Sequence, residues 1–282
     1  MNLAQPKELK QFLGRHGIKA DKGLGQHFLC SEPAVDAIVE SVHEAQGILE
    51  IGPGPGILTG PLSHEHGRVI ALEVDPRMVE LLQESAPMAD VRLQDAMRAD
   101  LPKILRELPS PRALVSNLPY YITGPLLTRI AEARGSFDVA VLMMQREVAE
   151  RVLAQIGDRN RGSLSVFLQL QFRIELVRRV PAGSFLPPPK VDSTILQFFP
   201  EGNGCSGELQ RLIRIGFAQP RKTLVNNLVS GYRVQRPQAL EWVTQLGHQE
   251  TARPSDIALA EWNRLSGMVS GQPLRTRSQF AD

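Results

Sequence analysis

"GILEIGPGPG", residues 47–56, determines the fold that we expect for this chain, because an apolar run leads directly into three glycines. The run at 47–51 is typical of a buried strand. Gly52, Gly54 and Gly56 permit a tight turn in which the backbone approaches a ligand closely, and a following helix would direct free N–H groups at the same place. The glycine spacing alone also fits a turn that binds nothing, so the neighbouring segments have to decide.

Downstream of this stretch, short apolar runs alternate with helix-like segments. The segment at 75–86 has Pro76 at the first position of a helix, where proline is accepted. This β-α-β-α alternation predicts a Rossmann-like α/β fold, with a mostly parallel sheet and helices on both faces. The runs predicted to form its other strands are at 68–74, 91–93, 113–116 and 139–144.

Two more strand-like runs, at 164–172 and 193–199, have little room for a crossover helix around them. We therefore expect them to add an antiparallel hairpin to the edge of the sheet. The stretch "EGNGCSG" at 201–207 is rich in turn-forming residues and predicts a linker, and helical patterns alone follow it. The sequence thus predicts two domains: a sheet domain with a basic N-terminal arm at 1–202, and an all-helical domain with a polar tail at 203–282.

The composition, with 42% apolar residues in a chain of 282, is that of an ordinary globular protein. Residues 1–29 carry five Lys/Arg and two Asp/Glu, and residues 201–282 carry ten Lys/Arg and seven Asp/Glu. Each end therefore has a net charge of +3, whereas the whole chain has a net charge of +2. Basic ends fit contact with a polyanion, although charge alone favours scattered, solvated side chains. His64 and His66 have no matching Cys or carboxylate cluster, so we expect no metal. Two cysteines and no long apolar segment predict a cytoplasmic protein without membrane association. We expect a monomer, although no feature of the sequence determines the oligomeric state.

Polar residues follow three successive predicted strands. Glu73 ends the second strand and lies 21 residues after Gly52 (73 − 52), the spacing expected for an acid that binds ribose hydroxyls. Asp95 follows the third strand and Asn117 the fourth. Because ligands bind beyond the carboxyl ends of strands in an open α/β sheet, we expect these side chains to share one crevice with the glycine loop. An acid after the third strand favours S-adenosylmethionine (SAM) over NAD as the bound cofactor. Asp95 would then accept a hydrogen bond from the adenine amine of SAM, and Glu73 would bind its ribose.

The stretch "NLPY", residues 117–120, resembles the motif of methyltransferases that modify exocyclic amines of bases. Such an amine is a poor nucleophile because its lone pair is delocalised into the ring. If the Asn117 side-chain oxygen and the Leu118 carbonyl accept its two hydrogens, the lone pair becomes localised on nitrogen. Pro119 fixes the turn, and Tyr120 offers a flat face to a base that has left its stack. A strand-exit turn with a capping amide is the alternative.

The chain as a whole resembles the KsgA/RsmA family of bacterial small-subunit rRNA adenine dimethyltransferases. The segments that carry the resemblance follow the family's order: "KGLGQHFL", "EIGPGPG", "ALEVD", "QDAM", "NLPYYI", "MQREVAERV", "RGSLSV", "FLPPPKVDS" and "RKTLVNNL". The resemblance implies SAM contacts from His27, Leu29, Gly52, Glu73, Asp95 and Asn117. Family members often have Asn at the position of His27, and either residue offers a polar tip. Phe185 matches the family's second aromatic, which implies stacking on the other face of the adenine, although Phe185 equally fits the core.

The resemblance also implies a function. It is SAM-dependent N6,N6-dimethylation of two adjacent adenosines near the 3′ end of 16S rRNA in the small ribosomal subunit, with a role in subunit maturation. These adenosines would lie in a hairpin loop, where bases are easily splayed out. One alternative is an Erm-type methyltransferase of large-subunit rRNA, which the "GQHFL" and "PPPKVDS" segments disfavour. Another is a non-catalytic ribosome-assembly or transcription factor, which the pair Asn117 and Tyr120 disfavours.

Four cations are candidates for contact with RNA. Arg221 and Lys222 stand at the start of the helix predicted at 221–229, where a cation does not favour the helix dipole, so an external phosphate would explain them. Arg159 and Arg161 lie in the polar loop "GDRNRGS". Charges in loops are usually solvated, which is the alternative for all four residues.

Overall fold

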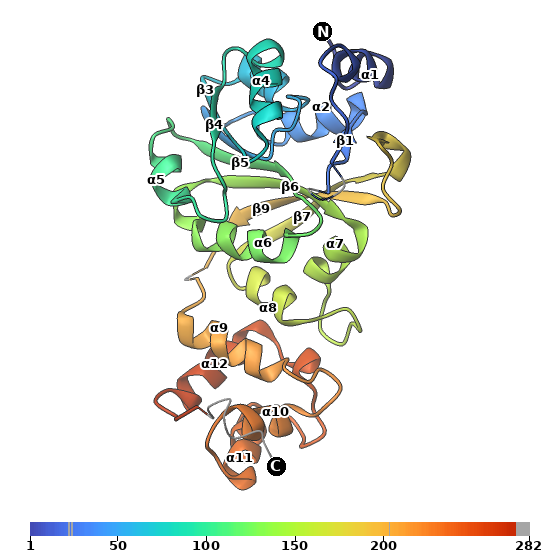
Figure 1. Cartoon of the computed structure of the whole chain (residues 1–282). Helices are drawn as coiled ribbons and strands as arrows, with labels where there is room; N and C mark the ends of the chain where they lie inside the picture. Colours follow the sequence, from blue (N-terminus) through green and yellow to red (C-terminus); the bar gives the residue numbers. More distant parts are fainter. Residues whose placement is uncertain (22, 24, 203, 275–282) are drawn as a thin grey trace. The chain divides into compact units, whose positions relative to one another are not determined.

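The computed structural model describes residues 1–21, 23, 25–202 and 204–274, and Figure 1 shows the arrangement of its helices and strands. Lys22 of the N-terminal motif and the end of the polar tail, 275–282, lie outside the described residues. The chain divides into two compact units. The first comprises Met1–Ala149 and Arg173–Pro200, and the second comprises Glu150–Phe172 and Glu201–Asp282. The second unit therefore takes in residues 150–172, which the sequence prediction assigned to the first domain.

A mixed sheet forms the centre of the first unit, with seven strands among the described residues in the order β4-β3-β2-β5-β6-β9-β7. Neighbours from β4 to β6 are parallel, and β9 is antiparallel to β6. This confirms the predicted Rossmann-like sheet with an antiparallel addition at one edge. The strands are β2 (Gly47–Ile51), β3 (Arg68–Glu73), β4 (Asp90–Leu93), β5 (Arg112–Asn117), β6 (Val139–Gln145), β7 (Phe172–Val180) and β9 (Ser193–Pro200).

Helices cover both faces of this sheet, so its central strands are apolar runs rather than alternating ones. Every residue of β2 is buried. One core cluster joins the sheet to the first four helices, and Figure 1 shows α6 on the face opposite α2. The helices are α1 (Pro6–Arg15), α2 (Glu32–Glu40), α3 (Thr59–Glu65), α4 (Pro76–Ser85), α5 (Leu101–Arg106), α6 (Thr123–Glu132) and α7 (Arg146–Leu153).

A short two-stranded sheet joins the N-terminal arm to the segment after β7. It consists of β1 (Phe28–Leu29) and β8 (Phe185–Leu186), which run antiparallel with Leu29 opposite Phe185. The backbone N–H of Cys30 also donates to the Ser184 carbonyl at 2.7 Å. These contacts fix the arm at the point where it leads into the functional site.

The strand predicted at 164–172 is wrong: residues Ser163–Gln169 form helix α8, and the strand begins at Phe172. A short apolar run does not by itself distinguish a buried helix from a strand. Here the Gly162 N–H donates to the Ser165 hydroxyl at 2.9 Å, which closes the first helical turn. The side chain of Val166 is fully buried in the core of the second unit.

The second unit is otherwise helical, as predicted for the C-terminal region. Its helices after α8 are α9 (Gly207–Gly216), α10 (Leu224–Gly231), α11 (Arg236–Gln245) and α12 (Leu259–Val269). Trp262 is fully buried at the centre and its ring stacks on Phe217 with the centroids 5.7 Å apart. Throughout the described parts of both units, no helix combines the length and the apolar character needed to cross a membrane.

Candidate active site

One cavity of about 390 Å³ opens at the carboxyl ends of the parallel strands. Its volume lies in the range of about 300–1,000 Å³ that is usual for small-molecule sites. Seven of the residues predicted from sequence to contact the cofactor line this cavity: His27, Leu29, Gly52, Gly54, Glu73, Asp95 and Asn117. Asn117 was also predicted to contact the base, and the other residues of its turn, Leu118, Pro119 and Tyr120, line the cavity as well. Gly56 and Phe185 do not line it.

The glycine loop adopts a backbone that side chains rarely tolerate. Gly52, Gly54 and Gly56 have φ angles of +70°, +56° and +91°. At Gly56 a Cβ would in addition collide with the Ser85 hydroxyl of α4. Gly56 therefore shapes the loop from outside the cavity, whereas Gly52 and Gly54 form the wall of the cavity itself.

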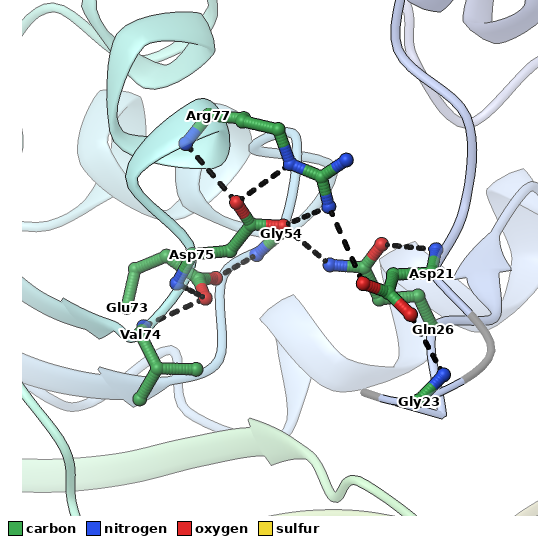
Figure 2. A network of polar contacts seen from close by, with 8 residues as sticks. All are labelled: Asp21, Gly23, Gln26, Gly54, Glu73, Val74, Asp75 and Arg77. Atoms are coloured by element: carbon green, nitrogen blue, oxygen red, sulfur yellow. Dashed lines mark hydrogen bonds and ion pairs between the residues drawn. The ribbon is translucent and has the colours of Figure 1, made fainter.

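Glu73 holds the loop and the end of β3 together, as Figure 2 shows. Its Oε2 accepts the Gly54 N–H at 3.0 Å, and its Oε1 accepts the N–H groups of Val74 and Asp75 at 2.8 and 2.9 Å. Burial raises the pKa of this carboxyl, while the three backbone donors oppose that shift. Because a carboxylate accepts about four hydrogen bonds, capacity remains for one more donor, such as a ribose hydroxyl.

Asp75 connects the turn after β3 to the N-terminal arm, also visible in Figure 2. It accepts hydrogen bonds from Arg77 Nε at 2.9 Å, from Arg77 Nη2 at 2.6 Å and from Gln26 Nε2 at 3.0 Å. The Arg77 guanidinium lowers the pKa of Asp75. Neither Gln26 nor Asp75 was predicted from sequence, although "DP" before a helical pattern is a recognisable N-cap signal.

We expect Asp75→Ala to lower the free energy of unfolding by about 2 kcal/mol, because it removes an N-cap and the contacts to Gln26 and Arg77. Asp100→Ala is the matched control, since Asp100 also caps a helix, accepting the Lys103 N–H at 3.0 Å, but is exposed. The cap alone is worth about 1 kcal/mol. Urea unfolding of both variants measures the difference. An Asp100 variant as unstable as the Asp75 variant would contradict a role for Asp75 beyond capping.

The turn after β5 contributes Asn117 and Leu118 to the wall of the cavity. Asn117 Nδ2 donates to the His27 carbonyl at 3.3 Å. The side-chain oxygen of Asn117 takes no part in this hydrogen bond. The Leu118 N–H donates to the Met143 carbonyl at 2.9 Å and so continues the pairing of β5 with β6. Within the described parts of the chain, no donor reaches the Asn117 side-chain oxygen or the Leu118 carbonyl. Neither oxygen is thus occupied by a donor from the described residues.

Tyr120 is held in place from two sides. Its hydroxyl forms a hydrogen bond with the Ser193 hydroxyl at 2.8 Å, and its ring stacks on His27 with the centroids 5.4 Å apart. His27 in turn contacts the Pro187 carbonyl through Nδ1 at 2.8 Å. Burial raises the pKa of the Tyr120 phenol, so it is neutral at ordinary pH. Next to it, Tyr121 lies at the cavity wall with 56% of its surface exposed.

Two of the predicted site residues are buried and do not line the cavity. Phe185 is 3% exposed and packs in the core cluster with β1, which favours the core alternative over base stacking. Arg161 is 4% exposed and donates from Nη1 to the Ser255 carbonyl at 2.7 Å, so its guanidinium is tied into the second unit. Arg159, Arg221 and Lys222 are exposed.

Sequence reasoning missed one acid in the cavity. Glu50, in β2 shortly before the glycine loop, lines the cavity and is 1% exposed. The signal was present, since an acid interrupts an apolar strand in "GILEI". Among the described residues no cluster of three or more metal-binding side chains occurs.

A glycine loop after β2, an acid at the end of β3 and an Asn-Leu-Pro-Tyr turn after β5, all around one cavity, define a SAM-dependent methyltransferase of the Rossmann-like class. Residues 17–265 match the family described as ribosomal RNA adenine dimethylase, and the chain belongs to this family. This confirms the resemblance identified from the sequence motifs.

Relatives and solved structures agree with this membership. The chain is 35% identical to the ribosomal RNA small subunit methyltransferase A of Latilactobacillus sakei subsp. sakei (strain 23K), over 97% of both chains. It is 34% identical to the enzyme of the same name from Dehalococcoides mccartyi (strain CBDB1), over 96% of this chain and 94% of the relative. A dimethyladenosine transferase from Plasmodium falciparum superposes with a TM-score of 0.70 at 28% identity, over 85% of this chain and 96% of that one. The 23S rRNA methyltransferase ErmE superposes with a TM-score of 0.64 at 26% identity, over 86% of this chain and 98% of that one.

Proposed function

We propose that this protein uses SAM to dimethylate the N6 amine of two adjacent adenosines near the 3′ end of 16S rRNA, in the small ribosomal subunit. The observation that supports this most directly is that Asn117 and Leu118, whose side-chain and backbone oxygens accept no hydrogen bond from the described residues, line the same cavity as the glycine loop. Relatives at 34–35% identity over nearly the whole chain carry the small-subunit name. We further propose that it acts as a monomer in the cytoplasm, during maturation of the subunit.

The residues around the cavity fit SAM as the bound group. Gly52 and Gly54 allow close approach of the backbone, and Glu73 has capacity for one more hydrogen-bond donor. Asp95 lines the cavity and holds its loop by accepting the Met97 N–H at 2.8 Å. We assign Glu73 to the ribose hydroxyls and Asp95 to the adenine amine. SAM supplies a methyl group that is already activated by its bond to a sulfonium.

The protein then has to bind and orient the target amine. We propose that the Asn117 oxygen and the Leu118 carbonyl each accept one of its hydrogens, which localises the nitrogen lone pair for attack. Tyr120, fixed by Ser193 and His27, would support the base against its ring. Positioning and electrostatic stabilisation of this kind supply the rate without a nucleophilic side chain. After the first transfer one N–H remains, so one of the two acceptors must tolerate a methyl group for the second.

The substrate is tested by incubating the protein with tritiated SAM and one of three substrates: under-methylated 30S particles, naked 16S rRNA or 50S particles. We expect label in small-subunit RNA, and mapping of the modified nucleotides should identify two neighbouring adenosines. Label confined to 50S particles would instead support the large-subunit alternative, which the similarity to ErmE raises. SAM binding without label in any RNA would support a non-catalytic assembly factor.

We propose that Arg159, Arg221 and Lys222 contact RNA phosphates. The pair Arg221 and Lys222 is exposed and directly precedes Thr223, which caps α10 by accepting the Asn226 N–H at 3.3 Å. The predicted docking role of the whole helical region rests on these cations and is likewise a proposal. Arg161 is left out because its guanidinium is buried.

Arg221→Gln together with Lys222→Gln should weaken RNA binding and reduce the slope of log affinity against log salt by about 1.5, since each lost phosphate contact removes about 0.7–0.9. Lys103→Gln with Arg106→Gln makes the same charge change on exposed positions of α5 and serves as control. Binding is measured by fluorescence anisotropy over a salt series. Equal slopes for the two double variants would argue that the pair does not contact phosphate.

A further inference from the structure

Tyr121 is an exposed aromatic residue that also lines the cavity. It follows Tyr120 in the turn after β5, and 56% of its surface is accessible to solvent. Every other aromatic residue in the described ranges is buried or half-buried. A single exposed apolar side chain is common on protein surfaces and needs no explanation by itself. A ring that both lines a cavity and faces solvent lies at the opening of that cavity, where its flat face can meet a second group.

The two consecutive tyrosines of this turn have different surroundings. Tyr120 is fixed by the hydrogen bond to Ser193 and by stacking on His27. The Tyr121 side chain makes no hydrogen bond, ring-stacking contact or cation–π contact with any residue that the structure describes. The protein itself therefore uses the Tyr120 ring and hydroxyl, whereas more than half of the Tyr121 surface faces solvent.

The backbone around Tyr121 nevertheless restricts where its ring can lie. The Ile122 N–H donates to the Pro119 carbonyl at 3.2 Å, which closes the turn directly before α6. On the N-terminal arm, Gly25 has a φ angle of +61°, and a Cβ built there would lie 3.4 Å from Tyr121 Cδ1. The arm therefore runs beside one edge of the ring. A side chain restricted in this way loses less freedom when it binds a ligand than a fully mobile one does.

The proposed substrate places a second base close to this ring. In the proposed function, one of two adjacent adenosines leaves its stack and enters the cavity beside Tyr120. The nucleotide next to it loses a stacking partner, which is unfavourable unless another flat surface takes the place of that partner. This nucleotide is joined to the target by a single phosphate, so it stays near the opening of the cavity. Tyr121, next to Tyr120 in the chain, is the exposed ring at that opening.

We propose that Tyr121 binds the RNA by stacking on the base next to the adenosine in the cavity, and so replaces the stacking that this base loses. The class of ligand, a single-stranded RNA segment, rests on the proposed function. Aromatic side chains bind the bases of single strands through their π faces, with little dependence on the sequence. Tyr120 and Tyr121 then have separate tasks, since Tyr120 supports the reacting base and Tyr121 holds its neighbour outside the cavity.

The proposed contact is tested by removing the ring and the base separately. The probe is a fluorescein-labelled hairpin RNA with two adjacent adenosines in its loop, bound to the full chain together with S-adenosylhomocysteine, which has no methyl group to transfer. An abasic nucleotide replaces each of the loop bases in and around the adenosine pair in turn. For one abasic RNA we expect the wild type to lose about tenfold in affinity relative to the intact RNA, whereas Tyr121→Ala binds both RNAs equally. Independent effects of the ring and the base in every RNA would overturn the proposal.

Three further variants separate stacking from simple burial of apolar surface. Tyr121→Phe keeps the π face and should bind the intact RNA within about twofold of the wild type. Tyr121→Leu keeps an apolar side chain without a flat ring and should resemble Tyr121→Ala. Leu176→Ala is the matched control, because Leu176 lies on β7, is 49% exposed and does not line the cavity. A Phe variant as weak as the Ala variant would contradict stacking.

The same variants distinguish an RNA contact from a cover over the cofactor. Calorimetric titration should give the same SAM affinity for the wild type and Tyr121→Ala, within about twofold. With under-methylated 30S particles, kcat/KM should fall about tenfold in Tyr121→Ala and be retained in Tyr121→Phe. Equal losses of SAM and RNA affinity in Tyr121→Ala, or an unchanged kcat/KM, would overturn the proposal.

A failure of the proposed function gives a different result. Coupling between Tyr121 and a neighbouring base, without methylation of any ribosomal RNA, would refute the proposed substrate and leave the stacking contact intact. Methylation of small-subunit RNA with equal kcat/KM by the wild type and Tyr121→Ala would refute the role of Tyr121 alone.

Discussion

Asn117→Ala should abolish methyl transfer and leave SAM binding almost unchanged. The variant removes one of the two oxygens proposed to accept the hydrogens of the target amine, and the amine then keeps its lone pair delocalised in the ring. Loss of one preorganised electrostatic contact in an active site costs about 10²–10³ in rate. We therefore expect kcat to fall by at least about 100-fold, measured as tritium incorporated into under-methylated 30S particles.

Two variants separate this effect from a change in the shape of the turn. Asn117→Asp keeps an acceptor oxygen but loses the donor to the His27 carbonyl, so it should retain part of the activity. Ser193→Ala removes the partner of the Tyr120 hydroxyl and leaves both acceptor oxygens, and its activity should fall by less than tenfold, or about 1.4 kcal/mol. Wild-type activity in Asn117→Ala would rule out the proposed orientation of the amine.

The part of the site that the sequence predicted well is the part that depends on local chain geometry. Gly52, Glu73, Asp95 and Asn117 each follow a strand of a parallel sheet, and the carboxyl ends of such strands meet at one edge. Periodicity and strand order are therefore sufficient to place these residues at one edge of the sheet.

The part that was not predicted depends on contacts between segments that are distant in sequence. Nothing in the sequence around Phe185 indicates that β8 pairs with β1 and holds this ring in the core. Arg161 stands in a polar loop, yet it is buried because Ser255, 94 residues away, offers it a carbonyl. The run at 164–172 was misread because apolarity alone does not separate a helix from a strand.

Glu50 shows a different limit. An acid in an apolar strand is visible in the sequence, but only the structure shows that it is buried and at the wall of the cavity.

Glu73→Ala should weaken SAM binding, whereas Asn117→Ala should leave SAM binding almost unchanged and lower the rate of methyl transfer. The variant removes the acceptor for three backbone N–H groups, those of Gly54, Val74 and Asp75, together with the proposed ribose contact. A hydrogen bond to a charged group is worth about 1.5–3 kcal/mol, so losing the ribose contact and the position of the loop should weaken SAM binding by at least about 100-fold. Leaving the donors unpaired should also lower the free energy of unfolding by about 3 kcal/mol.

The two losses can be measured separately. Circular dichroism and urea unfolding report the stability of the variant, and calorimetric titration with SAM, at a temperature where the variant is folded, reports its affinity. Glu73→Gln keeps one acceptor oxygen at the same position, so it should lie between wild type and Ala in both measurements. If folded Glu73→Ala bound SAM as tightly as the wild type, Glu73 would be a purely structural tie between β3 and the glycine loop, and the ribose would have to bind elsewhere in the cavity.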